Sequence, residues 1–378
     1  MTRQDHKKVS IMVTGGHLTP AVATMEEIQK SHPDWSLVFV GRSTALEGTG
    51  TKSEEEDVIR AMSVPFVSIV AGRLRRDFGW NTLRSLLKVP VGFIEACVII
   101  AKHRPTLVLS FGGYVALPIC CAAFLFRIPV VTHEQTMRPG LANRIIARIA
   151  KAIAVSFAEA KPYLMPLGRR VEVTGLPVRR SVLSAPKKTE LPVSHKRPVL
   201  FIAGGSTGSV SINALVFPVL PELLAEYTVI HQVGKVSYEE AERIRRNLPV
   251  AVRGEYLPFA YLSGTQFRDA LYGCSLFIGR SGANTVTEIA MAGIPAIWIP
   301  LPWAAANEQW HNAKFLEDKG TSVIWEQRRL TPNELVLAVR SMMESLSEYR
   351  KSALSLAGEI PRNGAERLVR LVEDELPS

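Results

Sequence analysis

Four glycine-rich turns are the segments of this sequence best suited to bind a ligand. They are TGGH (14–17), FGGY (111–114), GGSTGS (204–209) and RSGANT (280–285). Each lies between a short apolar run and a longer amphipathic one, which is typical of strand-to-helix turns in an open α/β sheet. Backbone N–H groups and helix dipoles point to that edge of the sheet, where they can bind an anion. Because glycines also permit tight packing without a ligand, only the set of four predicts an anion-binding cleft.

The turn at 280–285 is the most informative of the four. A helix that starts at Ser281–Gly282 presents the backbone N–H groups of residues 282–285 to a diphosphate. Glu288 then lies in the second helical turn, where its carboxylate can accept hydrogen bonds from both hydroxyls of a ribose. The alternative interpretation is an exposed helical glutamate that binds nothing.

A polar segment, NEQWHNA (307–313), follows the next apolar run. It places Glu308, Gln309 and Asn312 at the mouth of the predicted cleft, where amides and carboxylates suit the hydroxyls of a sugar. The alternative is a helix N-terminus that is rich in polar capping residues.

Several other classes of site lack their motifs. No turn has G-x-G-x-x-G in place, which disfavours a dinucleotide dehydrogenase, and the absence of G-x-x-x-x-G-K-[ST] excludes a P-loop NTPase. No D-x-D pair could hold a cation against a diphosphate. The cysteines have no C-x-x-C spacing, which indicates reduced core residues and no metal site; they are Cys97, Cys120, Cys121 and Cys274.

Strands that alternate with helices must position these turns. Short apolar, β-branched runs occur at 9–13, 35–40, 66–70, 106–111, 129–133 and 153–156, and again at 199–205, 227–234, 275–279 and 295–300. This alternation predicts parallel sheets covered on both faces, and a charged, proline-bearing link at 183–198 separates the two series. We therefore predict two Rossmann-like domains facing a central cleft, residues 1–180 and 181–359, with a last helix at about 360–378 that packs back on the first.

The stretch from Leu107 to Phe126 contains no charged residue and has the length of a membrane span. A buried strand, a glycine turn and a helix explain it better, because it contains Ser110, Gly112, Gly113 and Pro118. The first apolar run of the chain is too short for a signal peptide. These patterns predict a cytoplasmic protein.

The chain of 378 residues has a formal net charge of +10. Such a surface attracts an anionic partner, which could be nucleic acid, phospholipid headgroups or a phosphorylated substrate. Because no basic stripe is interleaved with stacking aromatic residues, we expect no nucleic-acid partner.

Taken together, the motifs resemble the MurG family of UDP-N-acetylglucosamine:undecaprenyl-pyrophosphoryl-muramoyl-pentapeptide N-acetylglucosaminyltransferases. The resemblance runs in the same order from residue 9 to about 320. It rests on TGGHLTPA (14–21), SFGGYVALP (110–118), HEQTMRPGLANR (133–144), VTGLPVR (173–179), GGSTGS (204–209), RSGANTVTEIAMAGIP (280–295) and NEQWHNA.

The resemblance implies a GT-B fold and an inverting transfer of GlcNAc from UDP-GlcNAc to undecaprenyl-linked lipid I, which forms lipid II. It also implies no cofactor, no metal ion and a peripheral location at the cytoplasmic face of the plasma membrane. The missing D-x-D pair agrees with metal independence.

The same resemblance implies roles for individual residues. Donor binding falls to Thr14, Gly15, Gly16, Arg179, Ser206, Arg280, Ala283, Asn284, Thr285, Glu288, Gln309 and Asn312. Among these, Arg179 and Ser206 would stabilise the leaving UDP, and Gln309 and Asn312 would face the GlcNAc. Four of them would face the uridine and ribose: Arg280, Asn284, Thr285 and Glu288. Acceptor binding falls to His17, Gly112, Gly113, Tyr114 and Thr136.

His17 is the first candidate for the general base, because an imidazole with a pKa near 6.5 can take a proton from an acceptor hydroxyl at neutral pH. The alternative is that His17 orients the acceptor pyrophosphate or caps its helix. Glu134 is the reserve base.

Three features depart from the family pattern, and all lie in the first domain. The first loop lacks the two extra glycines usual before TGGH, Thr136 replaces the asparagine of HEQN, and a polar stretch at 45–57 is lengthened.

A lipid-linked acceptor requires a membrane-docking face, which we expect at 71–93. Arg75 and Arg76 would meet anionic inner-leaflet phospholipid, while Trp80 and Leu83 would supply apolar contact. The alternative is an ordinary amphipathic helix packed on the sheet.

Three other functions remain open at this point. They are a glycosyltransferase that acts on another lipid such as diacylglycerol, a non-hydrolysing sugar-nucleotide epimerase of the same architecture, and a non-catalytic nucleotide-sugar-binding protein.

Overall fold

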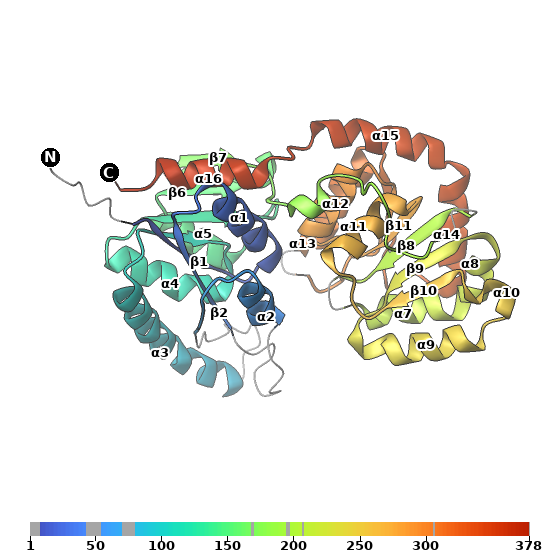
Figure 1. Ribbon diagram of the computed structural model, residues 1–378, viewed down its shortest axis with the longest axis horizontal. Helices are drawn as coiled ribbons and strands as arrows, with labels where there is room; N and C mark the ends of the chain where they lie inside the picture. The colour runs from blue at the N-terminus through green and yellow to red at the C-terminus, as the bar shows by residue number, and fades with distance from the viewer. Residues whose placement is uncertain are drawn as a thin grey trace. The chain divides into compact units, whose positions relative to one another are not determined.

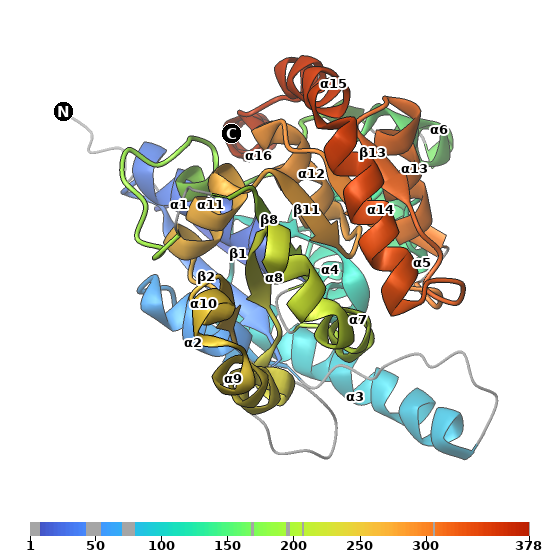
Figure 2. The same cartoon turned by 90° about the vertical axis from the view of Figure 1, so that its right-hand side faces the viewer.

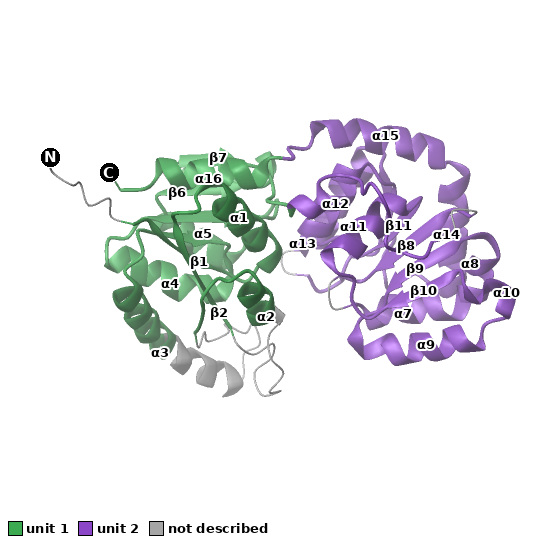
Figure 3. Cartoon of the chain, viewed as in Figure 1, with its two compact units in different colours: residues 1–179, 363–378 green, residues 180–362 purple. Residues whose placement is uncertain are grey.

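The computed structural model describes residues 8–42, 54–69, 80–167, 170–193, 197–205, 208–304 and 307–377, except for the side chains of residues 54, 80–89 and 167. Figure 1 shows these segments and labels most of their helices and strands. The chain forms two compact units. Unit 1 comprises residues 1–179 and 363–378, and unit 2 comprises residues 180–362 (Figure 3).

Unit 1 is built on a parallel sheet with the strand order β3-β2-β1-β4-β5-β6-β7 in its described part. The strands are β1 (Ser10–Thr14), β2 (Ser36–Gly41), β3 (Phe66–Ser68), β4 (Leu107–Ser110), β5 (Val130–Glu134), β6 (Ala152–Val155) and β7 (Arg170–Val173). β4, β5 and β6 are buried along their whole length, because helices cover both faces of a parallel sheet. The strand order reverses between β1 and β4, and open α/β sheets bind ligands at that position.

Helices cover both faces of this sheet. One apolar core lies under α1 (Leu18–Ser31), α2 (Glu54–Ala61) and α16 (Gly364–Asp374). The other lies under α3 (Trp80–His103), α4 (Gly113–Leu125) and α5 (Leu141–Ile149). A short helix, α6 (Lys161–Leu164), precedes β7. Both covering layers begin at the carboxyl edge of the sheet, where α1 and α4 start directly after β1 and β4.

α16 comes from the far end of the chain and packs beside α1. Its first residue, Gly364, must be a glycine, since an added Cβ would lie 2.5 Å from the Leu176 carbonyl oxygen. At its other end, Arg170 pairs with Asp374 at 3.0 Å and Lys151 pairs with Glu375 at 3.2 Å. The helix is therefore held to unit 1 at both ends.

Unit 2 has a second parallel sheet with the order β10-β9-β8-β11-β12-β13 in its described part. The strands are β8 (Val199–Ala203), β9 (Thr228–Gln232), β10 (Tyr256–Phe259), β11 (Leu276–Gly279), β12 (Ala296–Trp298) and β13 (Ser322–Ile324). Here too the order reverses next to the first strand, between β8 and β11. The predicted fold of two Rossmann-like sheets is confirmed.

The helices of unit 2 also lie on both faces of its sheet. A core cluster packs α7 (Val210–Val216), α8 (Leu220–Glu226) and α14 (Pro332–Glu344) on one face. On the other face, Phe267 of α11 (Gly264–Gly273) packs edge-on against Phe201 of β8. The remaining helices are α9 (Tyr238–Asn247), α10 (Val250–Arg253), α12 (Ala283–Ala292), α13 (Glu308–Asp318) and α15 (Leu346–Glu359). Short 3-10 turns are η1 (Ala158–Ala160), η2 (Met165–Leu167), η3 (Arg180–Val182), η4 (Phe217–Val219) and η5 (Lys235–Ser237).

Local sequence signals explain several of these elements. The uncharged stretch 107–126 forms β4, a glycine turn and α4, as predicted. Thr331 caps α14 through a reciprocal capping box with Glu334, which Pro332 at the first helical position supports. Among the described residues, no helix is both long and apolar enough to cross a membrane.

Three strands were not predicted from the sequence. They are β7, β10 and β13, and each forms an edge of its sheet. Every strand that was predicted is present.

Candidate active site

The two glycine turns of unit 1 touch each other at the carboxyl edge of its sheet. Gly16 N donates to Gly112 O at 3.0 Å. Gly15 admits no side chain, because an added Cβ would lie 2.8 Å from the Cβ of Phe111, and Gly112 has a φ of 72°. Neither His17 nor Gly112, the N-cap residues of α1 and α4, caps its helix through a side chain. Two helix N-termini thus converge where the strand order reverses, which favours an anionic ligand.

His17 lies beside this junction and is half-buried. Its Nδ1 is 2.7 Å from the amide nitrogen of Gln135, the residue that follows β5. Burial lowers the pKa of His17, and the nearby Glu134 carboxylate opposes that effect by raising it. The net lowering leaves the imidazole neutral at neutral pH, which is the protonation state that a general base requires.

Both oxygens of the Glu134 carboxylate accept hydrogen bonds from residues that follow β5. Glu134 is only 3% exposed. Its Oε1 accepts from the backbone N–H of Thr136 at 2.8 Å and from the hydroxyl of Thr136 at 2.7 Å, while Oε2 accepts from Asn143 Nδ2 at 2.7 Å. A carboxylate with these partners orders the loop after β5, so His17 is the better placed of the two candidate bases.

The other acceptor-side and first-turn residues take different positions. The Thr14 hydroxyl is fully buried and donates to Val40 O at 3.0 Å, so this side chain stabilises the sheet and does not face a ligand. The Thr136 side chain is occupied by Glu134, as described above. Tyr114, in the first turn of α4, lies under the Arg42 guanidinium, which is 4.9 Å from the centre of its ring.

Arg42, Gln135 and Asn143 are site residues that the sequence reasoning did not assign. Arg42 follows β2 and reaches Tyr114 beyond β4, so its guanidinium spans the end of β1, which lies between those strands. An arginine directly after an apolar strand run was the available signal. Gln135 and Asn143 lie inside the HEQTMRPGLANR block, but nothing in their spacing reveals their partners.

In unit 2 the helix after RSG begins where the sequence predicts. α12 starts at Ala283, and its N-cap, Gly282, provides no side-chain cap for the first-turn N–H groups. Half-buried Asn284 and Thr285 lie in that turn, and Asn284 Oδ1 is buried without a hydrogen-bond partner in the described structure. Glu288 is 8% exposed, so the alternative of an exposed helical glutamate does not apply.

The guanidinium of Arg280 is buried among neutral oxygen atoms and is 5% exposed. One nitrogen donates to Ile299 O at 2.8 Å, and another lies 2.6 Å from both Ser211 Oγ and Gln327 Oε1. Ser209, at the end of the GGSTGS turn, is also a partner, at 3.1 Å. Burial lowers the pKa of Arg280 to about 10, so the side chain remains charged at neutral pH. The contacts place this cation next to the glycine turn; Ser206 lies outside the described residues.

Gln309 and Asn312 connect α13 to the start of α12. Ser281 Oγ donates to Gln309 O at 2.7 Å, and Asn312 Nδ2 donates to Ser281 O at 3.1 Å. The Gln309 side-chain oxygen accepts from Leu301 N at 3.0 Å. Asn312 is fully buried rather than at the surface, so its amide positions the α12 turn. Arg179 is the last residue of unit 1 before the chain enters unit 2. It is half-buried, and its Nε has no hydrogen-bond partner among the described residues.

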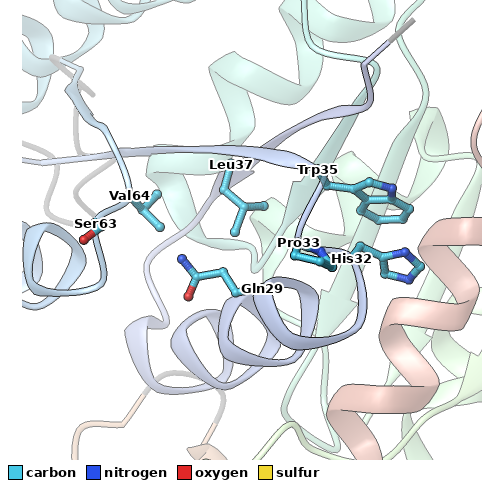
Figure 4. Close-up of a pocket in the computed structure, with 7 residues that line it drawn as sticks. All are labelled: Gln29, His32, Pro33, Trp35, Leu37, Ser63 and Val64. Carbon is cyan, nitrogen blue, oxygen red and sulfur yellow. The ribbon is translucent and has the colours of Figure 1, made fainter. Parts of the chain in front are cut away.

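A cavity of about 260 Å³ lies elsewhere in unit 1 (Figure 4). It is lined by Gln29, His32, Pro33, Trp35, Leu37, Ser63 and Val64. Trp35 directly precedes β2 and Leu37 is its second residue, so this cavity is at the amino edge of the sheet, opposite the glycine turns. No group of three or more His, Cys, Asp or Glu side chains within the described segments could hold a metal ion.

Comparison with known proteins identifies the family. Residues 10–155 match the glycosyltransferase family 28 N-terminal domain, and residues 199–368 match the corresponding C-terminal domain. A protein of Treponema denticola named UDP-N-acetylglucosamine--N-acetylmuramyl-(pentapeptide) pyrophosphoryl-undecaprenol N-acetylglucosamine transferase is 33% identical over 365 residues, which cover 92% of this chain and 93% of that protein. This chain belongs to the MurG family.

A second MurG-family protein, from Carboxydothermus hydrogenoformans and with the same name, is 30% identical over 367 residues, 95% of each chain. The crystal structure of Acinetobacter baumannii MurG has a TM-score of 0.72 and 25% identity, covering 97% of this chain and 99% of that one. Membership of the MurG family makes this protein a glycosyltransferase of GT-B fold, as the sequence predicts.

Proposed function

We propose that the protein transfers GlcNAc from UDP-GlcNAc to undecaprenyl-pyrophosphoryl-MurNAc-pentapeptide, lipid I, with inversion at the anomeric carbon and without a metal ion. The observation that carries the proposal is the half-buried His17 at the junction of two helix N-termini that have no side-chain cap. The names of the relatives support the choice of donor and acceptor.

On the donor side, the first turn of α12 offers its N–H groups to the UDP diphosphate, and Glu288 one turn later accepts from the ribose hydroxyls. The Arg280 charge stabilises the diphosphate from beneath the glycine turn, although its hydrogen bonds go to protein groups. Gln309 and Asn312 position this turn, and Arg179 and Ser206 stay candidates for contact with the leaving UDP.

On the acceptor side, the turns at 15–17 and 112–114 bind the acceptor diphosphate with Arg42 and Tyr114. His17 takes the proton of the acceptor hydroxyl while that oxygen attacks the anomeric carbon of GlcNAc. The bond from this carbon to UDP breaks on the opposite face, so the configuration inverts. Helix N-termini and arginines then stabilise the negative charge on the departing UDP. In other active sites a divalent cation has this role.

Transfer of radiolabelled GlcNAc from UDP-GlcNAc to purified lipid I tests this function, with the configuration of the new bond determined in the product. We expect label in lipid II, a β-linked product, and the same rate after EDTA treatment. Diacylglycerol and an acceptor-free reaction serve as the comparison. Label in diacylglycerol would indicate a glycosyltransferase for another lipid, and epimerised sugar nucleotide would indicate an epimerase. No turnover would indicate a non-catalytic nucleotide-sugar-binding protein.

Arg280→Met removes the buried charge and keeps most of the side-chain volume. We expect the KM for UDP-GlcNAc to rise by about three- to tenfold with little change in kcat, because a long-range attraction to the diphosphate, worth about 1 kcal/mol, is lost. Steady-state kinetics measures this effect, and Arg253→Met, in α10 before the edge strand β10, serves as the control. An unchanged KM in the folded variant would leave Arg280 with a structural role alone.

The membrane face is proposed on unit 1, where a lipid-linked acceptor requires it. Arg75 and Arg76 lie outside the described residues, and Trp80 and Leu83 lie in α3 without described side chains. Farther along α3, Val91, Ile94 and Val98 are exposed at helical spacing. α4 lies beside α3 (Figure 1 and Figure 2). Phe124 and Leu125 at the end of α4 and Phe126 directly after it are exposed. This apolar surface supports docking to anionic inner-leaflet phospholipid at the cytoplasmic face of the plasma membrane.

Combined replacement Arg75→Glu, Arg76→Glu and Trp80→Ala should weaken binding to anionic liposomes at least tenfold. Each arginine near such a surface contributes about 1 kcal/mol, and the tryptophan adds interfacial contact. Flotation with phosphatidylglycerol liposomes measures the effect, with Leu337→Ala, an exposed apolar position of unit 2, as control. If the triple variant floats like wild type and still uses lipid I in bilayers, docking occurs on another face.

A further inference from the structure

We infer that Gln135 fixes the tautomer of His17: its amide oxygen accepts a hydrogen bond from Nδ1–H and leaves Nε2 as the basic nitrogen. Gln135 is thus a positioning residue that acts through His17 and does not touch the substrate. The inference rests on the proposed function, in which His17 is the general base.

The close contact between the two side chains is the starting observation for this assignment. Gln135 is 7% exposed, and one atom of its amide lies 2.7 Å from His17 Nδ1. The amide nitrogen occupies that position, and the oxygen is buried on the other side without a partner in the described structure. Amide oxygen and nitrogen are nearly equal in size, so a half-turn of the group exchanges them within the same packing. The tautomer that His17 needs as the general base then decides which atom faces the ring.

The two orientations have opposite consequences for His17. A neutral imidazole carries one hydrogen, and the partner of Nδ1 determines which nitrogen holds it. An NH₂ group that donates to Nδ1 would place the hydrogen on Nε2, which could then donate but could not accept a proton. A carbonyl oxygen that accepts from Nδ1–H leaves the Nε2 lone pair available, and only this state supports general-base catalysis.

The proton balance of the transfer follows from this tautomer. Nε2 takes the proton of the acceptor hydroxyl as its oxygen bonds to the anomeric carbon and the bond to UDP breaks. The ring then carries hydrogens on both nitrogens, and the Gln135 oxygen still accepts from Nδ1–H. Within the segments that the structure describes, two other titratable groups interact with His17 through their charge, and both belong to β5. Glu134 favours the imidazolium by its charge, while burial lowers the pKa of His133 to about 3 and keeps that ring neutral.

Neither titratable group of β5, the strand that precedes Gln135, can perform this task. Both oxygens of Glu134 are bonded to Thr136 and Asn143, and His133 Nε2 lies 3.1 Å from Ser156 Oγ. A neutral amide also suits a base better than a second carboxylate would, because added negative charge raises the histidine pKa and keeps the ring protonated at neutral pH.

The tautomer can be observed without turnover by nitrogen NMR of protein labelled with ¹⁵N-histidine, recorded above the His17 pKa. The signals that disappear in His17→Ala assign this residue among the 8 histidines. We expect the hydrogen on Nδ1 in wild type and a mixture of tautomers in Gln135→Met. A hydrogen on Nε2 in wild type would overturn the inference. The NMR sample contains no acceptor, so its result does not depend on which acceptor the enzyme uses. Failure to transfer GlcNAc to lipid I would therefore count against the proposed function alone.

Kinetics supplies the second test. Gln135→Met should lower kcat about tenfold with the KM for UDP-GlcNAc within about twofold of wild type. Gln135→Glu should retain activity at high pH and move the acid limb of the kcat profile upward by about one pH unit or more. Gln29→Met, in the cavity at the opposite sheet edge, is the matched control. Wild-type kcat in Gln135→Met, or an unshifted profile in Gln135→Glu, would show that Gln135 only fills space.

Discussion

Replacement of His17 by alanine is expected to lower kcat by about 10²–10⁴, with donor binding retained, as for removal of a general base. The imidazole is the half-buried group at the junction of the two glycine turns, and the Glu134 carboxylate beside it is bonded to its own loop. Single-turnover rates and the affinity for UDP-GlcNAc measure the two effects separately. His32→Ala, at the amino edge of the same sheet, is the matched control.

The direction in which kcat changes with pH also follows from the surroundings of His17. Burial lowers the pKa of His17 below its ordinary value of about 6.5, so the ring is neutral above that lowered pKa and activity is lost as pH falls through it. Wild type should therefore show an acid limb below about pH 6.5 that is missing from the residual activity of His17→Ala. Near-normal kcat across the pH range in the variant would transfer the role to Glu134 or to solvent.

Replacement of Glu288 by alanine is expected to raise the KM or Kd for UDP-GlcNAc roughly ten- to a hundredfold. A charge-assisted hydrogen bond to a ribose hydroxyl contributes about 1.5–3 kcal/mol, and the variant loses it. Glu288 is almost fully buried in the second turn of α12, one turn beyond the N–H groups proposed to bind the diphosphate. Isothermal titration with UDP measures the effect directly.

Two variants serve as controls for the Glu288 experiment. Glu288→Gln keeps the shape but loses the charge, so its affinity should fall between those of wild type and the alanine variant. Glu344→Ala, an exposed position of the same unit, should bind UDP like wild type. Unchanged donor affinity in folded Glu288→Ala would show that this carboxylate does not contact the ribose.

The central strands could be predicted from the sequence, but three edge strands could not. A central strand of a parallel sheet is buried on both faces, so β4, β8 and β11 appear as uninterrupted apolar runs. β7 is only half-buried, and its charged residues, Arg170 and Glu172, break the apolar pattern. β10 contains Pro258, which argues against a central strand but is accepted at an edge.

The part of the candidate site that could be predicted is the part in which one short segment contains both the glycine turn and the functional side chain. α12 begins directly after Gly282, and Glu288 follows at a fixed helical distance, so the local pattern was sufficient. The partner of His17 is Gln135, 118 positions away, and only the order of β1, β4 and β5 in the sheet brings them together. A polar residue type alone also did not show that Asn312 lies in the interior.

The position of α16 affects the order in which the protein can fold as it is made. Leu368, Val369, Leu371 and Val372 of this helix are buried in the core of unit 1, against α1 and the first sheet. The ribosome releases these residues only after all of unit 2, and domains generally fold as units during synthesis. The second unit therefore has its whole sequence available first, although it lies later in the chain. Until α16 emerges, the nascent first unit exposes an apolar stripe beside α1, a surface suited to transient protection by a chaperone.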